Sequence, residues 1–295
     1  MTDHASQLIA FPKTKSFFVG VDSDGCAFDS MEPKHKACFY PMTVQHWELA
    51  GVAKYVRDVW DFVNLYGRTR GCNRFHALLH TFDWLADWPD AVERGYESPK
   101  VDSLRQWVAE ETKLGNPALE VKVAAMNDAA LQQALRWSRA INEQVASIVH
   151  DVPPFPLVAD CLQRLADAAD VMVVSATPSE ALEREWAEHD IARYAGMICG
   201  QEMGRKAEHL RYGASGKYDA DKVLMIGDAP GDMKAARDNG FLFFPVNPGC
   251  EVESWRRFHD EAAERFFAGQ YAGDYEQALI DDFLACLPKY PPWEG

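Results

Sequence analysis

The sequence lacks an excess of positive charge and any apolar run long enough to cross a membrane. Its formal net charge is −15 at pH 7, because 45 acidic residues outnumber 30 basic ones. Such a chain repels phosphate backbones and anionic lipid headgroups, so we expect neither a nucleic-acid partner nor a membrane partner. A membrane-spanning helix needs about 20 consecutive apolar residues, and no run approaches that length.

Closely spaced cysteine pairs are also missing. The seven cysteines are dispersed and contain no Cys-x-x-Cys pair. An odd number without such pairs favours free thiols in a reducing compartment over a disulfide framework or a zinc site. The first fifteen residues, MTDHASQLIAFPKTK, lack the basic region and apolar core of a signal peptide. We therefore expect a soluble, cytoplasmic protein.

The sequence is rich in apolar and aromatic residues, which can form a hydrophobic core. Hydrophobic residues make up 47% of the 295 positions and aromatic residues 12%. These fractions exclude a disordered chain, and the length suits one large domain or two ordinary ones.

One short stretch combines an apolar run with closely spaced acids. Residues Phe17–Val21 are apolar at every position, and Asp22, Asp24 and Gly25 follow at once. A run without polar alternation is typical of a strand buried on both faces of a parallel sheet. Ligands bind beyond the carboxyl ends of such strands, and two adjacent carboxylates favour a hard cation such as Mg²⁺. The alternative from this stretch alone is a solvated acidic turn.

The rest of the chain divides into two patterns. Residues 30–152 show helical periodicity without a convincing strand, until Pro153, Pro154 and Pro156 break the chain. Strands and helices then alternate, which predicts a three-layer, Rossmann-like α/β core with a parallel sheet. We therefore predict a core formed by residues 1–29 and 153–295, with a helical C-terminal tail, and a helical cap domain at 30–152. The further strands are expected near residues 171–174, 196–199, 223–226 and 241–246.

Polar groups of complementary chemistry follow three of these strands. Besides the first acidic pair, Ser175 ends the second strand, and Asp228 and Asp232 follow the strand at 223–226. A lysine, Lys206, opens the helix that precedes that strand. Carboxylates, a hydroxyl and an ammonium at one sheet edge suit a metal ion and a phosphate group.

This set of motifs resembles the haloacid dehalogenase superfamily, specifically its aspartyl-phosphate phosphatases. VDSDG is similar to the first motif, VVSAT to the second, GRK to the lysine motif and MIGDAPGD to the fourth. The resemblance covers about residues 15–30 and 153–249, and residues 30–152 stand where that superfamily carries a helical cap.

The resemblance implies a catalytic pair in the first motif. Asp22 would be the nucleophile that receives the phosphoryl group. Asp24 would protonate the leaving oxygen and then activate the water, and its backbone carbonyl would ligate Mg²⁺. Because expulsion of a halide needs no acid, the presence of Asp24 favours phosphate chemistry over dehalogenation.

The other motifs would bind the metal and the phosphate. Ser175 would hold the phosphate, with Thr177 as the alternative, and Lys206 would restrain both the phosphate and the nucleophile. Asp228 would ligate Mg²⁺ directly and Asp232 would bind or orient a ligating water. The alternative for Asp232 is a helix cap, and Lys217 and Lys222 are the rivals of Lys206.

A basic loop in the cap is our hypothesis for what binds the substrate. Residues 66–76 contain Arg68, Arg70 and Arg74, one histidine and no acid. Arginine forks suit a carboxylate or a second phosphate, and the alternative is a solvated basic loop.

Together these features predict a Mg²⁺-dependent phosphomonoester hydrolase that acts on a small phosphorylated metabolite in the cytoplasm. The nearest alternative is a phosphotransferase or sugar phosphomutase that forms the same intermediate. The second is a non-hydrolytic binding protein. The aromatic tail either covers the core or forms the face of a homodimer.

Overall fold

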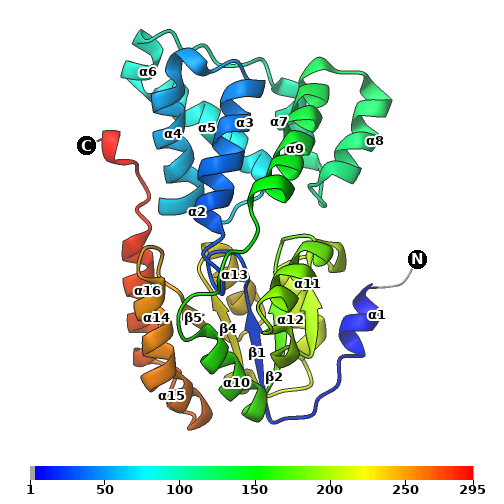
Figure 1. The fold of residues 1–295 in the computed structure, drawn as a ribbon, viewed down its shortest axis with the longest axis vertical. Helices are drawn as coiled ribbons and strands as arrows, with labels where there is room; N and C mark the ends of the chain where they lie inside the picture. The colour runs from blue at the N-terminus through cyan, green and yellow to red at the C-terminus, as the bar shows by residue number, and fades with distance from the viewer. Residues whose placement is uncertain (1–3, 295) are drawn as a thin grey trace. The chain divides into compact units, whose positions relative to one another are not determined.

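The protein, described here from a computed structural model of residues 4–294, has two compact units (Figure 1). One contains residues 1–31 and 151–287, and the other contains residues 32–150 and 288–295. The two boundaries near residues 30 and 152 lie within two residues of those expected. Residues 288–294 differ, because we expected them in the core and they group with the helical unit.

A five-stranded parallel sheet forms the centre of the first unit, as the predicted α/β fold class requires. Its order is β3-β2-β1-β4-β5, so the chain extends the sheet from β1 first on one side and then on the other (Figure 1). Ligand sites in such sheets lie where the order reverses, beyond the carboxyl ends of the strands. The strands are β1 (Phe17–Val21), β2 (Ala169–Val174), β3 (Met197–Cys199), β4 (Val223–Gly227) and β5 (Leu242–Pro245).

Helices cover both faces of this sheet, which explains the unbroken apolar run in β1. Val19 and Val21 pack with Trp186 and Trp255 in one cluster, whereas Phe18 packs with Leu210 in another. Successive side chains of a strand point to opposite faces, so a strand covered on both sides needs apolar residues throughout. The helices of this unit are α1 (His4–Ile9), α10 (Val158–Ala168), α11 (Ser179–Glu188), α12 (Lys206–Ala214), α13 (Pro230–Asp238), α14 (Glu251–Arg257), α15 (Ala263–Phe267) and α16 (Asp274–Cys286).

The second unit is helical, and residues 32–150 and 288–294 contain no strand. Its core is rich in large rings, among them Trp60, Phe75, Trp107 and Trp137. Its helices are α2, which begins in the first unit (Met31–Pro33), α3 (Tyr40–His46), α4 (Ala53–Asp61), α5 (Arg74–Asp87), α6 (Pro89–Glu93), α7 (Asp102–Glu110), α8 (Asn116–Met126) and α9 (Ala129–Ile148). Within residues 4–294, no helix combines the length and apolar character that crossing a bilayer requires.

The C-terminal segment contacts the rest of the helical unit through a tryptophan and a backbone hydrogen bond. The indole of Trp293 stacks on Trp88, with ring centroids 4.3 Å apart and planes 4° apart. It also meets the ring of Phe62 edge-on at 5.7 Å. The Arg68 backbone N–H donates to the Pro288 carbonyl at 3.2 Å. These contacts explain why residues 288–294 group with the helical unit and not with the sheet.

We predict that Trp293→Ala lowers the free energy of unfolding by about 1–2 kcal/mol, because two aromatic contacts are lost. Tyr290→Ala is the matched control, since that ring is 59% exposed on the same segment. Urea unfolding of both variants measures the difference. Equal midpoints for the two would show that the stacking does not stabilise the fold.

Candidate functional site

Three buried carboxylates meet beyond the carboxyl ends of β1 and β4. Asp22 follows β1, Asp228 follows β4, and Asp232 lies in the first turn of α13. Each offers an oxygen to a cluster in which all such oxygens lie within 4.8 Å of one another. Their exposed fractions are 4%, 1% and 0% respectively. Residues up to 210 positions apart in the sequence therefore form one site because β1 and β4 are neighbours in the sheet.

Lys206, the first residue of α12, supplies positive charge to this cluster. Its Nζ donates to Asp22 Oδ2 and to Asp232 Oδ1, both at 2.6 Å. The rival lysines are engaged elsewhere: Lys217 donates to backbone carbonyls, and Lys222 donates to Asp219.

The sequence left two roles open for Asp232, one in the metal site and one as a helix cap, and its side chain makes a contact that suits each. One carboxylate oxygen accepts from Lys206, and the other accepts from the Ala229 backbone N–H at 3.0 Å. The second contact caps the start of α13. Asp232 therefore caps the helix and belongs to the carboxylate cluster at the same time.

The electrostatics of the cluster favour a further cation. Burial raises the pKa of Asp22 to about 7, against the opposing effect of the Lys206 ammonium. Burial likewise raises the pKa of Asp232. The pKa of Lys206 is raised, because attraction to Asp22 and Asp232 outweighs the opposing effect of burial. Three carboxylates and one ammonium leave negative charge away from water, and hard divalent cations prefer such oxygen ligands. The donor set therefore fits Mg²⁺.

Asp24 is held by hydroxyl groups. Thr177 Oγ1 donates to its Oδ2 at 2.7 Å, and Ser30 Oγ donates to its Oδ1. The chain turns directly after Asp24, where Gly25 has a φ of +74°, a conformation that glycine adopts readily. The assignment of the Asp24 carbonyl to the metal stays a prediction.

The two hydroxyls that follow β2 have different partners. Ser175 is buried, its backbone N–H donates to the Cys199 carbonyl, and its Oγ accepts from the Thr177 backbone N–H. The Thr177 hydroxyl donates to Asp24. The choice of Ser175 over Thr177 for the phosphate stays a prediction, and the contact between Thr177 and Asp24 was missed. The available signal was the position of Thr177, a hydroxyl residue two positions after Ser175, which is the first polar residue beyond β2.

The three arginines of the basic loop lie in the helical unit. Arg70 is 4% exposed, and its Nη1 donates to the Leu65 carbonyl at 2.8 Å. Arg74 Nη1 donates to Ser138 Oγ and Asn142 Oδ1, at 3.1 and 2.7 Å. The guanidiniums of Arg70 and Arg74 thus bind the helical unit itself, whereas Arg68 is exposed. A role of this loop in binding substrate stays a prediction.

A glycine that we did not single out leaves the space that Asp232 occupies. A Cβ on Gly227, the last residue of β4, would stand 2.4 Å from Asp232 Cβ. Non-bonded carbon atoms do not approach so closely, so any other residue there would displace the carboxylate.

We predict that Gly227→Ala costs about 1–3 kcal/mol of stability, because the new methyl group overpacks a buried site. Gly231→Ala is the matched control: it lies four residues on, and a Cβ there would meet nothing within 4 Å. That control should be neutral or stabilising. Urea unfolding measures both, and an unchanged Gly227→Ala variant would contradict the close approach.

His209, one turn after Lys206 on α12, gives the fold a pH dependence. It is fully buried, and burial followed by the Lys206 charge lowers its pKa from 6.5 to about 4. Because the unfolded chain binds a proton more readily, we predict that stability is lost as pH falls from 6.5 towards 4. Thermal unfolding of wild type and His209→Gln across this range tests it. The variant should lose less stability than wild type over these pH values.

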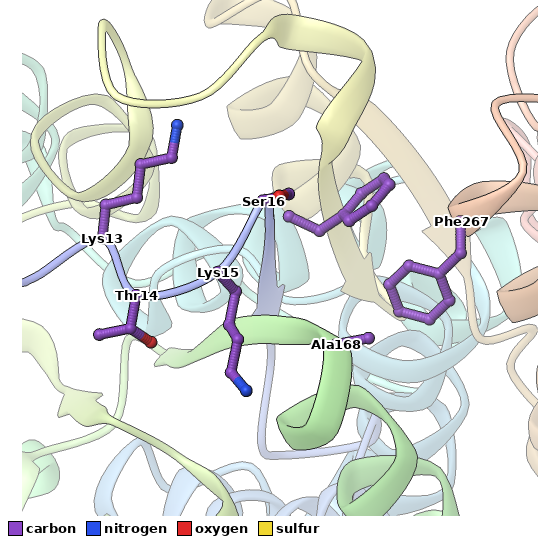
Figure 2. A pocket seen from close by; sticks show the side chains of 7 residues that line it. Lys13, Thr14, Lys15, Ser16, Ala168 and Phe267 are labelled. Atoms are coloured by element: carbon purple, nitrogen blue, oxygen red, sulfur yellow. The ribbon is translucent and has the colours of Figure 1, made fainter.

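A separate cavity of about 600 Å³ lies at the other end of the strands, where β1 and β2 begin (Figure 2). Phe17 begins β1 there, and Ala168 precedes β2. Figure 2 shows the side chains of Lys13 and Lys15 extending in different directions on the segment that leads into β1. Their ammonium groups donate to the carbonyls of Lys217 and Asp167. This cavity is not part of the carboxylate cluster, which lies at the carboxyl ends of the strands.

Comparison with known proteins gives structural likenesses only. No family model matches the chain, and no curated protein matches it. It is similar to a haloacid dehalogenase-like hydrolase from Streptococcus pneumoniae, with 14% identity, a TM-score of 0.40, and coverage of 83% of this chain and 92% of the other. For a predicted phosphatase from Clostridium acetobutylicum, the values are 16%, 0.40, 79% and 85%. For a HAD-superfamily hydrolase of subfamily IA from Geobacter sulfurreducens, they are 13%, 0.38, 79% and 88%. At such low identities and TM-scores, function has to be inferred from the residues of the site.

Proposed function

We propose that this protein is a Mg²⁺-dependent phosphomonoester phosphatase of the haloacid dehalogenase superfamily. One observation carries the proposal: Asp22, Asp228, Asp232 and Lys206 form one buried cluster, and Asp24 follows Asp22 by two residues. Phosphoryl transfer depends mainly on positioning and on neutralising charge, and this cluster offers the groups for both.

The first half of the reaction uses both residues of the acidic pair. A carboxylate oxygen of Asp22 attacks the phosphorus of the substrate, and the bond from phosphorus to the leaving oxygen breaks. The leaving oxygen takes a proton from the carboxylic acid of Asp24. The Lys206 ammonium, 2.6 Å from Asp22 Oδ2, stabilises the charge of the nucleophile and of the transferred group.

The second half regenerates the enzyme. Asp24, now ionised, takes a proton from a water molecule whose oxygen attacks the phosphorus. The bond between phosphorus and Asp22 breaks, which releases inorganic phosphate. Mg²⁺ held by Asp22, Asp228 and Asp232 would neutralise negative charge on the phosphoryl group. We expect Ser175 to bind a phosphate oxygen.

The test is release of inorganic phosphate from a panel of small phosphorylated metabolites, with Mg²⁺ or with a chelator. We expect turnover that the chelator abolishes and that Mg²⁺ restores. Isomerisation of sugar phosphates without net phosphate release would favour a phosphomutase instead. Binding without any turnover across the panel would count against an enzyme.

A further inference from the structure

Asp24 has a hydroxyl donor on each of its two carboxylate oxygens. Thr177 lies three residues beyond the end of β2, and its Oγ1 is 2.7 Å from Asp24 Oδ2. Ser30 lies immediately before α2 and is fully buried, and its Oγ donates to Asp24 Oδ1. The two donors come from segments about 150 residues apart that meet because β2 lies beside β1.

Two hydrogen bonds, one donated to each oxygen, restrict the rotation of a carboxylate. In the proposed reaction Asp24 is an acid in the first half and a base in the second. The arrangement seen here, with a hydroxyl directed at each oxygen, fixes the orientation of the carboxylate. A hydroxyl can also rotate and accept a hydrogen bond, so it can hold the carboxylic acid in the same place, whereas a methyl group can neither donate nor accept.

We propose that Thr177 is a positioning residue that holds the Asp24 carboxylate in the orientation needed to take a proton from the water that hydrolyses the aspartyl phosphate. The inference rests on the proposed function and adds a role for a residue that the reaction scheme above does not use. Without the Thr177 hydroxyl, the Asp24 carboxylate loses one donor and one constraint on its orientation. Proton removal from the attacking water then slows more than the transfer of the phosphoryl group to Asp22, because the bound substrate holds the leaving oxygen in place whereas the water depends on Asp24 for its position.

This unequal slowing has a kinetic signature. If hydrolysis becomes the slow step, the phosphoenzyme accumulates, and the leaving group appears in a burst before steady turnover. General acid–base groups contribute roughly 10²–10⁴-fold to rate, so loss of one donor to such a group should lower kcat by about 10–100-fold. KM should fall rather than rise, because the intermediate accumulates.

The experiment measures p-nitrophenol release from p-nitrophenyl phosphate by stopped flow, with Mg²⁺ present. Thr177→Val keeps the shape of the side chain and should show a burst approaching one equivalent per active site. Ser30→Ala should shift the kinetics in the same direction. Thr177→Ser should restore wild-type behaviour, because it restores the hydroxyl.

Ser179→Ala is the matched control, because Ser179 lies two residues on and its hydroxyl donates to Glu202. Unfolding curves exclude a variant that fails to fold. If wild type turns over and Thr177→Val slows both steps equally, or slows neither, the role of Thr177 is wrong and the proposed function stands. If wild type forms no phosphoenzyme and releases no phosphate, both are wrong.

Discussion

Replacing Asp22 by asparagine is expected to lower phosphate release by about 10⁴-fold or more, because removal of a covalent nucleophile leaves only binding and positioning. The substitution keeps the shape of the side chain and one of its two oxygens. The amide cannot form a stable acyl phosphate. Substrate binding should change far less than turnover, since Lys206 and the other carboxylates remain.

Two measurements separate the loss of a nucleophile from general damage to the site. The phosphoenzyme is trapped by acid quenching with labelled substrate, and peptide mapping should place the label on Asp22 in wild type and nowhere in Asp22→Asn. Asp219→Asn is the matched control, because Asp219 is an exposed carboxylate in the same unit with a lysine partner. A label on another residue, or turnover within tenfold of wild type, would contradict the assignment.

Much of the sheet could be predicted from sequence because the pattern is local. Strands buried on both faces need apolar runs, and β1, β2, β4 and β5 all have them. The Asp22 and Asp228 positions follow from that pattern, since each is the first polar side chain after a strand.

Other features depend on contacts between distant segments and have no local signal. Nothing near Trp293 indicates that it stacks on Trp88, about 200 residues away. Likewise, Arg70 and Arg74 form part of a basic loop in the sequence, yet Arg70 donates to the Leu65 carbonyl and Arg74 to Asn142, both within the helical unit. A cluster of basic residues without nearby acids therefore indicates a ligand-binding loop only if backbone carbonyls and side-chain amides of the protein do not accept hydrogen bonds from them.

Replacing Lys206 by methionine is expected to have the largest effect on stability. The ammonium contacts two carboxylates whose side chains are 5% and 0% exposed, while its own side chain is 19% exposed. Removal of the ammonium leaves two buried carboxylates without this counter-charge. Breaking a buried ion pair in this way costs about 3–5 kcal/mol. Loss of a donor to the transition state should also lower kcat by about 10²–10³-fold.

The stability loss should depend on pH in a stated direction. Burial already raises the pKa of Asp22 to about 7, and without Lys206 both carboxyl groups would bind protons more strongly in the folded state. The variant should therefore lose less stability relative to wild type at pH 5, where these groups become protonated, than at pH 8, where they must ionise without the ammonium.

Urea unfolding in a metal chelator at both pH values measures this dependence. Two further variants identify its cause. Lys222→Met is the matched control, since that lysine pairs with Asp219 at the surface and should show no measurable change. In Lys206→Met/Asp232→Asn one of the two charges is also removed, so part of the lost stability should return at pH 8. If Lys206→Met is equally unstable at both pH values, and the second substitution restores nothing, the ammonium stabilises the fold by packing. The carboxylates would then not need it as a counter-charge.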